Sequence, residues 1–181
     1  KEQASDLLEQ MSPDEAADII GDLSPEKAKE ILELMEEEDA ENVQELLSHD
    51  EDTAGGLMTT EYIAYHSGLS VGDTIERFKR DASDIDTVYY IYILDEEERL
   101  IGVISLRDLL LSNTDSLLSE VMTRKVKTIT PETDQKQVAK IISKYNLVSL
   151  PVVDEHNRLL GVVTIDDVIN IFMPKRKKPR V

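Results

Sequence analysis

Two short motifs of the same kind could contact a ligand: Ser105-Leu106-Arg107-Asp108 and Thr164-Ile165-Asp166-Asp167. Each follows an apolar run typical of a strand and opens a run with helical spacing, which places a hydroxyl and free N–H groups at a helix N-terminus. Such an end can bind a phosphate, and the Asp carboxylate can accept hydrogen bonds from a ribose. The same residue types also cap a helix without any ligand. Taken alone, the motif leaves both interpretations open.

The motif occurs twice because the sequence contains a tandem repeat. The pairs Met58-Thr59 and Met122-Thr123 lie 64 residues apart, whereas the later landmarks Asp95 and Asp154 lie 59 apart. The first copy therefore carries five extra residues, between Phe78 and Asp95. Two units of this size are each too small to bury a good core alone, so we expect them to pack as a pair with a ligand cleft between them.

The elements that must position these motifs alternate between helix and strand, which indicates an α+β fold. Each copy is expected to read helix, strand, strand, helix, preceded by a short strand near Ile63 or over Val126–Ile129. In order along the chain, the predicted elements are a helix over 71–80, strands over 88–94 and 100–104, helices over 106–111 and 135–145, strands over 150–153 and 159–163, and a helix over 165–172.

Residues 1–52 form a different region of short amphipathic helices. Ser12-Pro13 and Ser24-Pro25 predict two helix starts, the first with a capping box to Glu15, and a third helix follows Glu36. These helices suggest part of a superhelix that buries Ala16, Ala17, Ile19, Ile20, Leu23, Ala28, Ile31, Leu32, Met35, Val43, Leu46 and Leu47. The paired glycines predict a hinge at 53–56 that breaks any helix.

Composition excludes several classes of protein. The chain has no Cys, three scattered His and no apolar run long enough to span a membrane, which argues against disulfides, thiolate or His metal centres and a membrane span. We expect a cytoplasmic location. The net charge of −18 divides into −16 over residues 1–56, −7 over 57–170 and +5 over 171–181. Nucleic acid is therefore not expected as a partner.

The repeats resemble a tandem pair of CBS domains, the modules named from cystathionine β-synthase. The segments Gly102–Asp108 and Gly161–Asp167 match that family's closing signature. Together with the acidic helices, Glu51–Thr59 and Val88–Tyr92, the chain is similar to the cytosolic part of MgtE-type magnesium channels. The predicted domains are 1–52, the hinge 53–56, CBS domains at 57–115 and 116–173, and a basic tail at 174–181.

This resemblance implies a Mg²⁺ sensor. In that family the acidic domain and the CBS pair close on one another when Mg²⁺ bridges them, and they separate at low Mg²⁺ so that the attached pore opens. By position, the candidate metal ligands are Asp14, Glu15 and Asp18 opposite Asp166 and Asp167. The resemblance also implies a homodimer through the CBS domains and a membrane pore domain in cis, or another effector. Asn146 and Asn170 stand where many relatives are expected to carry Asp, which would weaken some metal sites.

The resemblance further implies ATP or another adenine nucleotide as a ligand. The candidate contacts are Tyr90, Ser105, Arg107, Asp108, Leu147 with Val148, and Pro151, with Thr164 and Asp167 in the second copy. The chain has no Gly-rich phosphate loop and no catalytic constellation, so we expect no enzyme. The alternative function is an adenine-nucleotide sensor for a different effector, and the basic, Pro-containing tail would suit such a soluble regulator.

Overall fold

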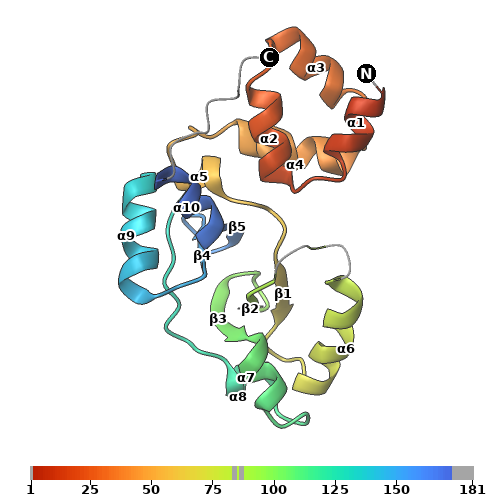
Figure 1. Ribbon diagram of the computed structural model, residues 1–181. Helices are drawn as coiled ribbons and strands as arrows, with labels where there is room; N and C mark the ends of the chain where they lie inside the picture. Colours follow the sequence, from red (N-terminus) through yellow and green to blue (C-terminus); the bar gives the residue numbers. More distant parts are fainter. Residues whose placement is uncertain (1, 83–84, 86–87, 173–181) are drawn as a thin grey trace.

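The computed structural model describes residues 2–82, 85 and 88–172 of the chain. Three groups of elements follow one another (Figure 1): a helical domain at the top, the second repeat at the left and the first repeat at the lower right. The predicted basic tail at 174–181 lies outside the described residues. One cluster of buried side chains continues from the helical domain through Ala54 and Met58 into the second repeat, so these two parts share a core.

The helical domain consists of α1 (Glu2–Leu8), α2 (Pro13–Gly21), α3 (Pro25–Leu32) and α4 (Glu37–Leu47). The prolines stand at the first turns of α2 and α3, as the sequence predicts, but Ser12 makes no side-chain cap bond, so the expected capping box is absent there. Short helices bury only a narrow stripe. Ala16, Ala17 and Ile20 occupy that stripe in α2, whereas the expected core residues Ile19 and Leu47 are 44% and 36% exposed.

The first repeat holds β1 (Ile63–His66), α6 (Val71–Asp81), β2 (Tyr90–Leu94), β3 (Leu100–Ser105) and α7 (Leu106–Leu111). Strand β1 pairs parallel with β2, and β2 pairs antiparallel with β3. The second repeat holds α9 (Gln135–Tyr145), β4 (Ser149–Val153), β5 (Leu159–Thr164) and α10 (Ile165–Phe172), with β4 and β5 antiparallel. Ile129 makes an isolated parallel bridge to Val152, where the first repeat has β1.

The two repeats exchange their opening segments. Thr59 bridges Val162 of the second repeat, and Thr123 bridges Val103 of the first. The short helix α5 (Ala54–Leu57) lies beside α9, and α8 (Leu118–Val121) lies with the first repeat (Figure 1). The core of the second repeat therefore includes Met58 from the range 57–115, and the core of the first repeat includes Leu118 and Met122 from the range 116–173.

The glycines of 53–56 are placed for close packing. Gly55 and Gly56 lie inside α5, and no Gly has a positive φ, so the expectation that this pair breaks a helix is wrong. A Cβ at Gly55 would overlap the His49 ring, and one at Gly56 would overlap the Asp50 carbonyl oxygen. The backbone must approach its neighbours closely here, which only Gly permits.

Gly161 also allows a close approach of two backbone segments, at the point where Thr59 pairs with the second repeat. Its replacement by Ala is therefore expected to destabilise the fold. A Cβ there would lie 2.7 Å from the backbone oxygen of Thr59, which cannot move without breaking the bridge to Val162. We expect Gly161→Ala to lower the free energy of unfolding by about 2 kcal/mol, as overpacking does. Urea denaturation would measure this. Gly68→Ala is the control, because that Cβ would meet nothing within 4 Å; equal effects of the two changes would contradict the packing argument.

Candidate functional site

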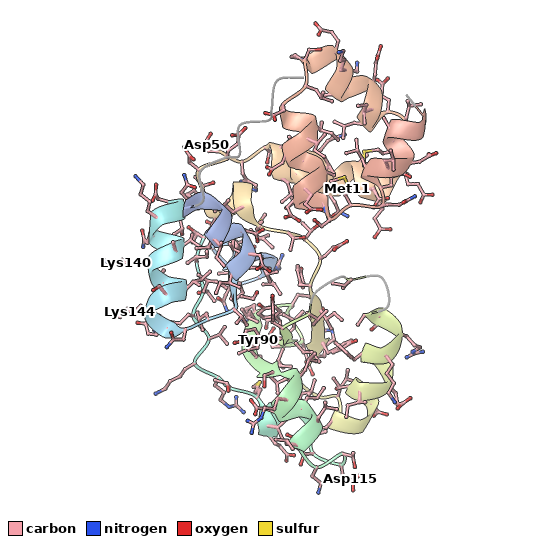
Figure 2. All side chains as sticks on the ribbon, viewed as in Figure 1. Met11, Asp50, Tyr90, Asp115, Lys140 and Lys144 are labelled. Atoms are coloured by element: carbon pink, nitrogen blue, oxygen red, sulfur yellow. The ribbon has the colours of Figure 1, made fainter. Side chains whose placement is uncertain are left out.

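A cavity of about 210 Å³ lies between the two repeats. Figure 2 labels Tyr90 at this junction. Elements from both repeats and the segment that connects them contribute to the wall, which is formed by Tyr90, Tyr92, Val103, Ser105, Asp108, Thr123, Lys125, Val126, Lys127, Leu147, Ser149 and Pro151. Five of the predicted nucleotide contacts, Tyr90, Ser105, Asp108, Leu147 and Pro151, therefore meet around one space. Its mixed wall of aromatic, aliphatic and charged groups suits a small polar ligand with a flat base.

The repeated motif of the first copy borders this cavity and also caps α7. The Ser105 hydroxyl donates to Asp108 Oδ2 at 2.7 Å and accepts from the Asp108 N–H at 3.1 Å. Ser105 and Asp108 therefore do cap the helix. The Asp108 side chain nevertheless remains 60% exposed, so it can accept further hydrogen bonds. Arg107 does not line the cavity: its side chain is 82% exposed, with Nη1 3.8 Å from Asp108 Oδ1.

A buried polar pair in the cavity wall links the two repeats. The Tyr92 hydroxyl and the Ser149 hydroxyl lie 2.9 Å apart and share a hydrogen bond between the repeats. Burial is the main reason that the pKa of the Tyr92 phenol is raised, so the ring stays neutral at physiological pH. Neither residue was among the predicted contacts, since nothing in the local sequence distinguishes them from ordinary strand residues.

The motif of the second copy lies beside a much smaller cavity. Thr164 donates to Asp167 Oδ2 from its N–H at 3.0 Å and from its hydroxyl at 2.6 Å. The cavity beside Thr164 measures only about 30 Å³, which is room for about one water molecule. Tyr89 lines it, and its hydroxyl donates to Asp166 Oδ2 at 3.3 Å. Thr164, predicted as a nucleotide contact, therefore borders a cavity much smaller than the one beside Ser105.

Asp167 instead belongs to a group of carboxylates where the helical domain meets the second repeat; we refer to Asp14, Asp166 and Asp167 as the carboxylate interface. Burial raises the pKa of the Asp167 carboxyl, the hydrogen bonds from Thr164 oppose this, and the charges of Asp14 and Asp166 raise the pKa further. Asp14 Oδ1 is buried without a hydrogen-bond partner. Like charges and an unpaired buried acceptor are costly unless a cation is present.

The other predicted metal ligands are more exposed. Glu15 and Asp18 both lie on the solvent-accessible surface of α2. Within the described residues, no three His, Cys, Asp or Glu side chains converge closely enough to hold an ion by direct contact alone. The donor set still fits Mg²⁺, because this ion prefers carboxylate oxygens and usually keeps several of its waters.

The raised pKa of Asp167 predicts a pH dependence. In metal-free buffer the folded state takes up the Asp167 proton at higher pH than the unfolded chain does, so its contribution to stability is present at low pH and is lost as the pH rises through the raised pKa. Melting temperatures from pH 3.5 to 8 in chelator, for the natural chain and for Asp167→Asn, would isolate this contribution. We expect the melting temperature of Asp167→Asn to increase relative to that of the natural chain as the pH rises. A difference independent of pH would contradict the assignment.

The structure describes the side-chain environment of only one of the two Asn residues that were expected to weaken metal sites, Asn146 and Asn170. Asn146 adopts the left-handed conformation at the end of α9, with φ 50°, which Asn tolerates well. Its type therefore has a structural reason. The side chain of Asn170 lies outside the described part of the chain.

The comparisons with known proteins agree with this architecture. The model of the MgtE intracellular N domain matches residues 1–52, and the CBS domain model matches twice, at 54–113 and 118–174. A solved structure titled as the cytosolic domain of the Mg²⁺ channel MgtE in complex with ATP superposes with a TM-score of 0.89 at 39% identity. The match covers 92% of this chain and 68% of that chain. The chain belongs to the MgtE family.

Other MgtE relatives support the same conclusion. The magnesium transporter MgtE of Thermus thermophilus is 45% identical over 124 residues, and that of Enterococcus faecalis is 36% identical over 124 residues. These alignments cover 68% of this chain but only 28% and 27% of the relatives, so the chain spans under a third of their length. Within the described ranges, no helix combines the length and apolar character that crossing a membrane requires.

The family assignment confirms the predicted fold class, a short-helix fragment followed by a tandem CBS pair. It also agrees with the expectation of a non-enzymatic module, since the MgtE matches are to parts of magnesium transporters. Lys125 and Lys127 line the cavity but were not predicted as contacts. Their only sequence signal is a run of basic residues in a strongly acidic protein.

Proposed function

We propose that this chain is the Mg²⁺-sensing regulatory part of a magnesium transporter. Mg²⁺ bridges the carboxylates of the helical domain and of the second repeat, and this closure reports a sufficient Mg²⁺ concentration to a pore domain. An adenine nucleotide binds in the cavity between the repeats. The observation that carries the proposal is the carboxylate interface, where the partly buried Asp14 and Asp167 of different domains are close enough for the charge of Asp14 to raise the pKa of Asp167.

Electrostatics supports the metal step. Residues 1–56 carry a net charge of −16 and residues 57–170 carry −7, so the two parts repel one another in water. The acceptor Asp14 Oδ1 has no donor in the described structure, and Asp166 Oδ2 accepts only the long bond from Tyr89. A hydrated divalent cation would supply the missing donors through its waters and would offset the repulsion.

The nucleotide step rests on the cavity wall and on one relative. Tyr90, Leu147 and Pro151 offer flat and apolar surfaces to a base, and Asp108 offers an acceptor to ribose hydroxyls. The solved MgtE domain with a TM-score of 0.89 is titled as an ATP complex. The second candidate function, an adenine-nucleotide sensor for another effector, uses this same cavity without the metal step.

A second copy of the chain is the partner proposed for the CBS domains. On α7, Leu110 and Leu111 are 69% and 72% exposed, and large apolar side chains this open favour burial in an interface. Light scattering would give the oligomeric state, and a monomer at micromolar concentration would remove the homodimer from the proposal.

The test of the metal step is small-angle scattering of the purified chain through a Mg²⁺ titration, with Na⁺ at matched ionic strength as the control. Compaction specific to Mg²⁺, with a midpoint in the range of cellular free Mg²⁺, is the expected result. If the radius of gyration follows the Na⁺ control throughout, the metal step is wrong and the nucleotide sensor becomes the better proposal.

A further inference from the structure

An open groove of about 750 Å³ lies between α3 and α4 of the helical domain. Neither the carboxylate interface nor the cavity between the repeats includes any of its residues. The floor of the groove is apolar, since Met35 and Ala40 are buried and Ala28 and Leu32 are half-buried. No side chain of α3 is fully buried, so the described structure leaves part of this helix uncovered.

The rim of the groove is acidic and only partly neutralised. Lys29 Nζ lies 3.6 Å from Glu33 Oε1, so these two rim charges offset one another. Glu37 and Glu41 stand one turn apart on α4, and both are exposed. Within the described part of the chain neither of them forms an ion pair, and like charges at this spacing repel. The groove therefore favours an occupant that brings cations to α4 and apolar stems to the floor.

The chain itself contains a segment with this chemistry. Residues 175–180, which we call the basic segment, have the sequence Lys175-Arg176-Lys177-Lys178-Pro179-Arg180, with five cations and no acidic residue. No other part of the sequence has four consecutive Lys or Arg residues. Residues 1–56 carry a net charge of −16, so the two parts attract one another. Lys and Arg also carry aliphatic stems that can cover an apolar floor.

The basic segment follows an element that packs on the helical domain. Helix α10 ends at Phe172 and lies below the helical domain in Figure 1. Val168 of α10 belongs to the same cluster of buried side chains as Met35 and Ala40 in the floor of the groove. The eight residues 173–180 span up to about 26 Å when extended. This reach exceeds the length of α4, which is about 16 Å for its 11 residues.

We infer that the basic segment docks in the groove between α3 and α4 of its own chain, with its cationic groups at Glu37 and Glu41 and its aliphatic stems over the apolar floor. The docking does not depend on the proposed function, but its consequence rests on that function. A docked segment brings up to five positive charges to the helical domain. It thereby lowers the repulsion between this domain and the second repeat, which Mg²⁺ would otherwise have to offset.

Zero-length carbodiimide cross-linking of the full chain tests the docking directly, because this reagent joins an amine only to a carboxylate that it touches. A mixture of isotope-labelled and unlabelled protein distinguishes links within one copy from links between copies. We expect Lys175, Lys177 or Lys178 to be linked to Glu33, Glu37 or Glu41 of the same copy, as mass spectrometry of the digested protein would show.

Trypsin cleavage of the basic segment provides a second measurement, for the natural chain and for two double variants. The groove variant carries Glu37→Gln with Glu41→Gln. The matched control carries Glu38→Gln with Glu45→Gln, which removes the same charge from α4 at exposed positions that do not line the groove. Cleavage after Arg176 should be about fivefold faster in the groove variant, as the loss of two exposed ion pairs allows. The control should be cleaved at the natural rate.

Each contrary result overturns a stated part of the inference. Links between labelled and unlabelled copies would assign the groove to a second copy and exclude docking within one chain. Equal cleavage of the natural chain and the groove variant, or equal acceleration in the control, would exclude the groove as the docking site. If the groove variant keeps the Mg²⁺ midpoint of compaction, the consequence for Mg²⁺ is wrong. If the natural chain does not compact with Mg²⁺ at all, the proposed function fails, and the cross-links and cleavage rates still decide the docking.

Discussion

Asp108→Ala is expected to lower the affinity for ATP by about two orders of magnitude. In the proposed complex the Asp108 carboxylate accepts hydrogen bonds from the ribose hydroxyls, and each hydrogen bond to a charged group contributes about 1.5–3 kcal/mol. Ala removes both acceptors and leaves the hydroxyls of a bound nucleotide unpaired. Calorimetry of the variant with ATP and with AMP would measure the loss, which should be similar for the two nucleotides because both carry the ribose.

The chain offers a closely matched control for the structural part of this change. Ser70 and Asp73 cap α6 with the same reciprocal bonds that Ser105 and Asp108 make at α7: the hydroxyl donates at 2.8 Å and accepts at 3.1 Å. Asp73 lines no part of the cavity between the repeats. Asp73→Ala should therefore cost a similar amount of stability, about 0.5–1 kcal/mol, and leave ATP binding unchanged. Nucleotide affinity that survives Asp108→Ala would exclude Asp108 as the ribose acceptor.

Asp14→Asn is expected to have opposite effects with and without Mg²⁺. Without metal, the change removes one charge next to Asp167 and supplies an amide donor where Asp14 Oδ1 now has no partner. Leaving such a buried acceptor unpaired costs about 1–3 kcal/mol, so the variant should melt at a higher temperature than the natural chain in chelator. With Mg²⁺, the variant has lost a carboxylate, and the Mg²⁺ concentration at half-closure should rise by at least about tenfold.

A higher melting temperature in chelator together with weaker Mg²⁺ binding would distinguish a specific role of the carboxylate interface from the general effect of removing one negative charge. Asp115→Asn removes the same charge from an exposed position at the far end of the first repeat, which Figure 2 labels. It should change neither the melting temperature in chelator nor the Mg²⁺ midpoint of compaction by more than a small amount. A Mg²⁺ midpoint that Asp14→Asn leaves unchanged would remove Asp14 from the bridging set, and the search would move to Asp166 and Asp167.

Local rules in the sequence accounted for most of the secondary structure. The helix over Gln135–Tyr145 and the helix over Leu106–Leu111 begin and end at the predicted residues, because apolar spacing and capping residues act within a few positions of each other. The repeat, the charge division and the signature around Asp108 were likewise sufficient to indicate the CBS pair. These signals are either local or repeated, so they can be read without knowing what lies opposite each residue.

The tertiary structure decided what surrounds each copy of the motif. Ser105 and Thr164 look equivalent in sequence, yet the cavity beside Ser105 holds about 210 Å³ and the one beside Thr164 about 30 Å³. Tyr89 lies against Asp166 in the smaller space, and no periodicity in the strand predicts that contact. Cavity volume depends on side chains from several distant segments, and a sequence pattern describes one segment at a time.

The same reason applies to the charged groups. Asp14 and Asp167 are far apart in sequence, and their proximity arises only because the helical domain and the second repeat share a core. Lys127 and Lys144 meet at Tyr145 because the connecting segment passes the end of α9. The sequence by itself determined the family, the elements and the residue types available for binding. The packing between those elements determined which carboxylates, lysines and aromatic rings face one another, since Coulomb and contact energies depend on distance in space and not on separation along the chain.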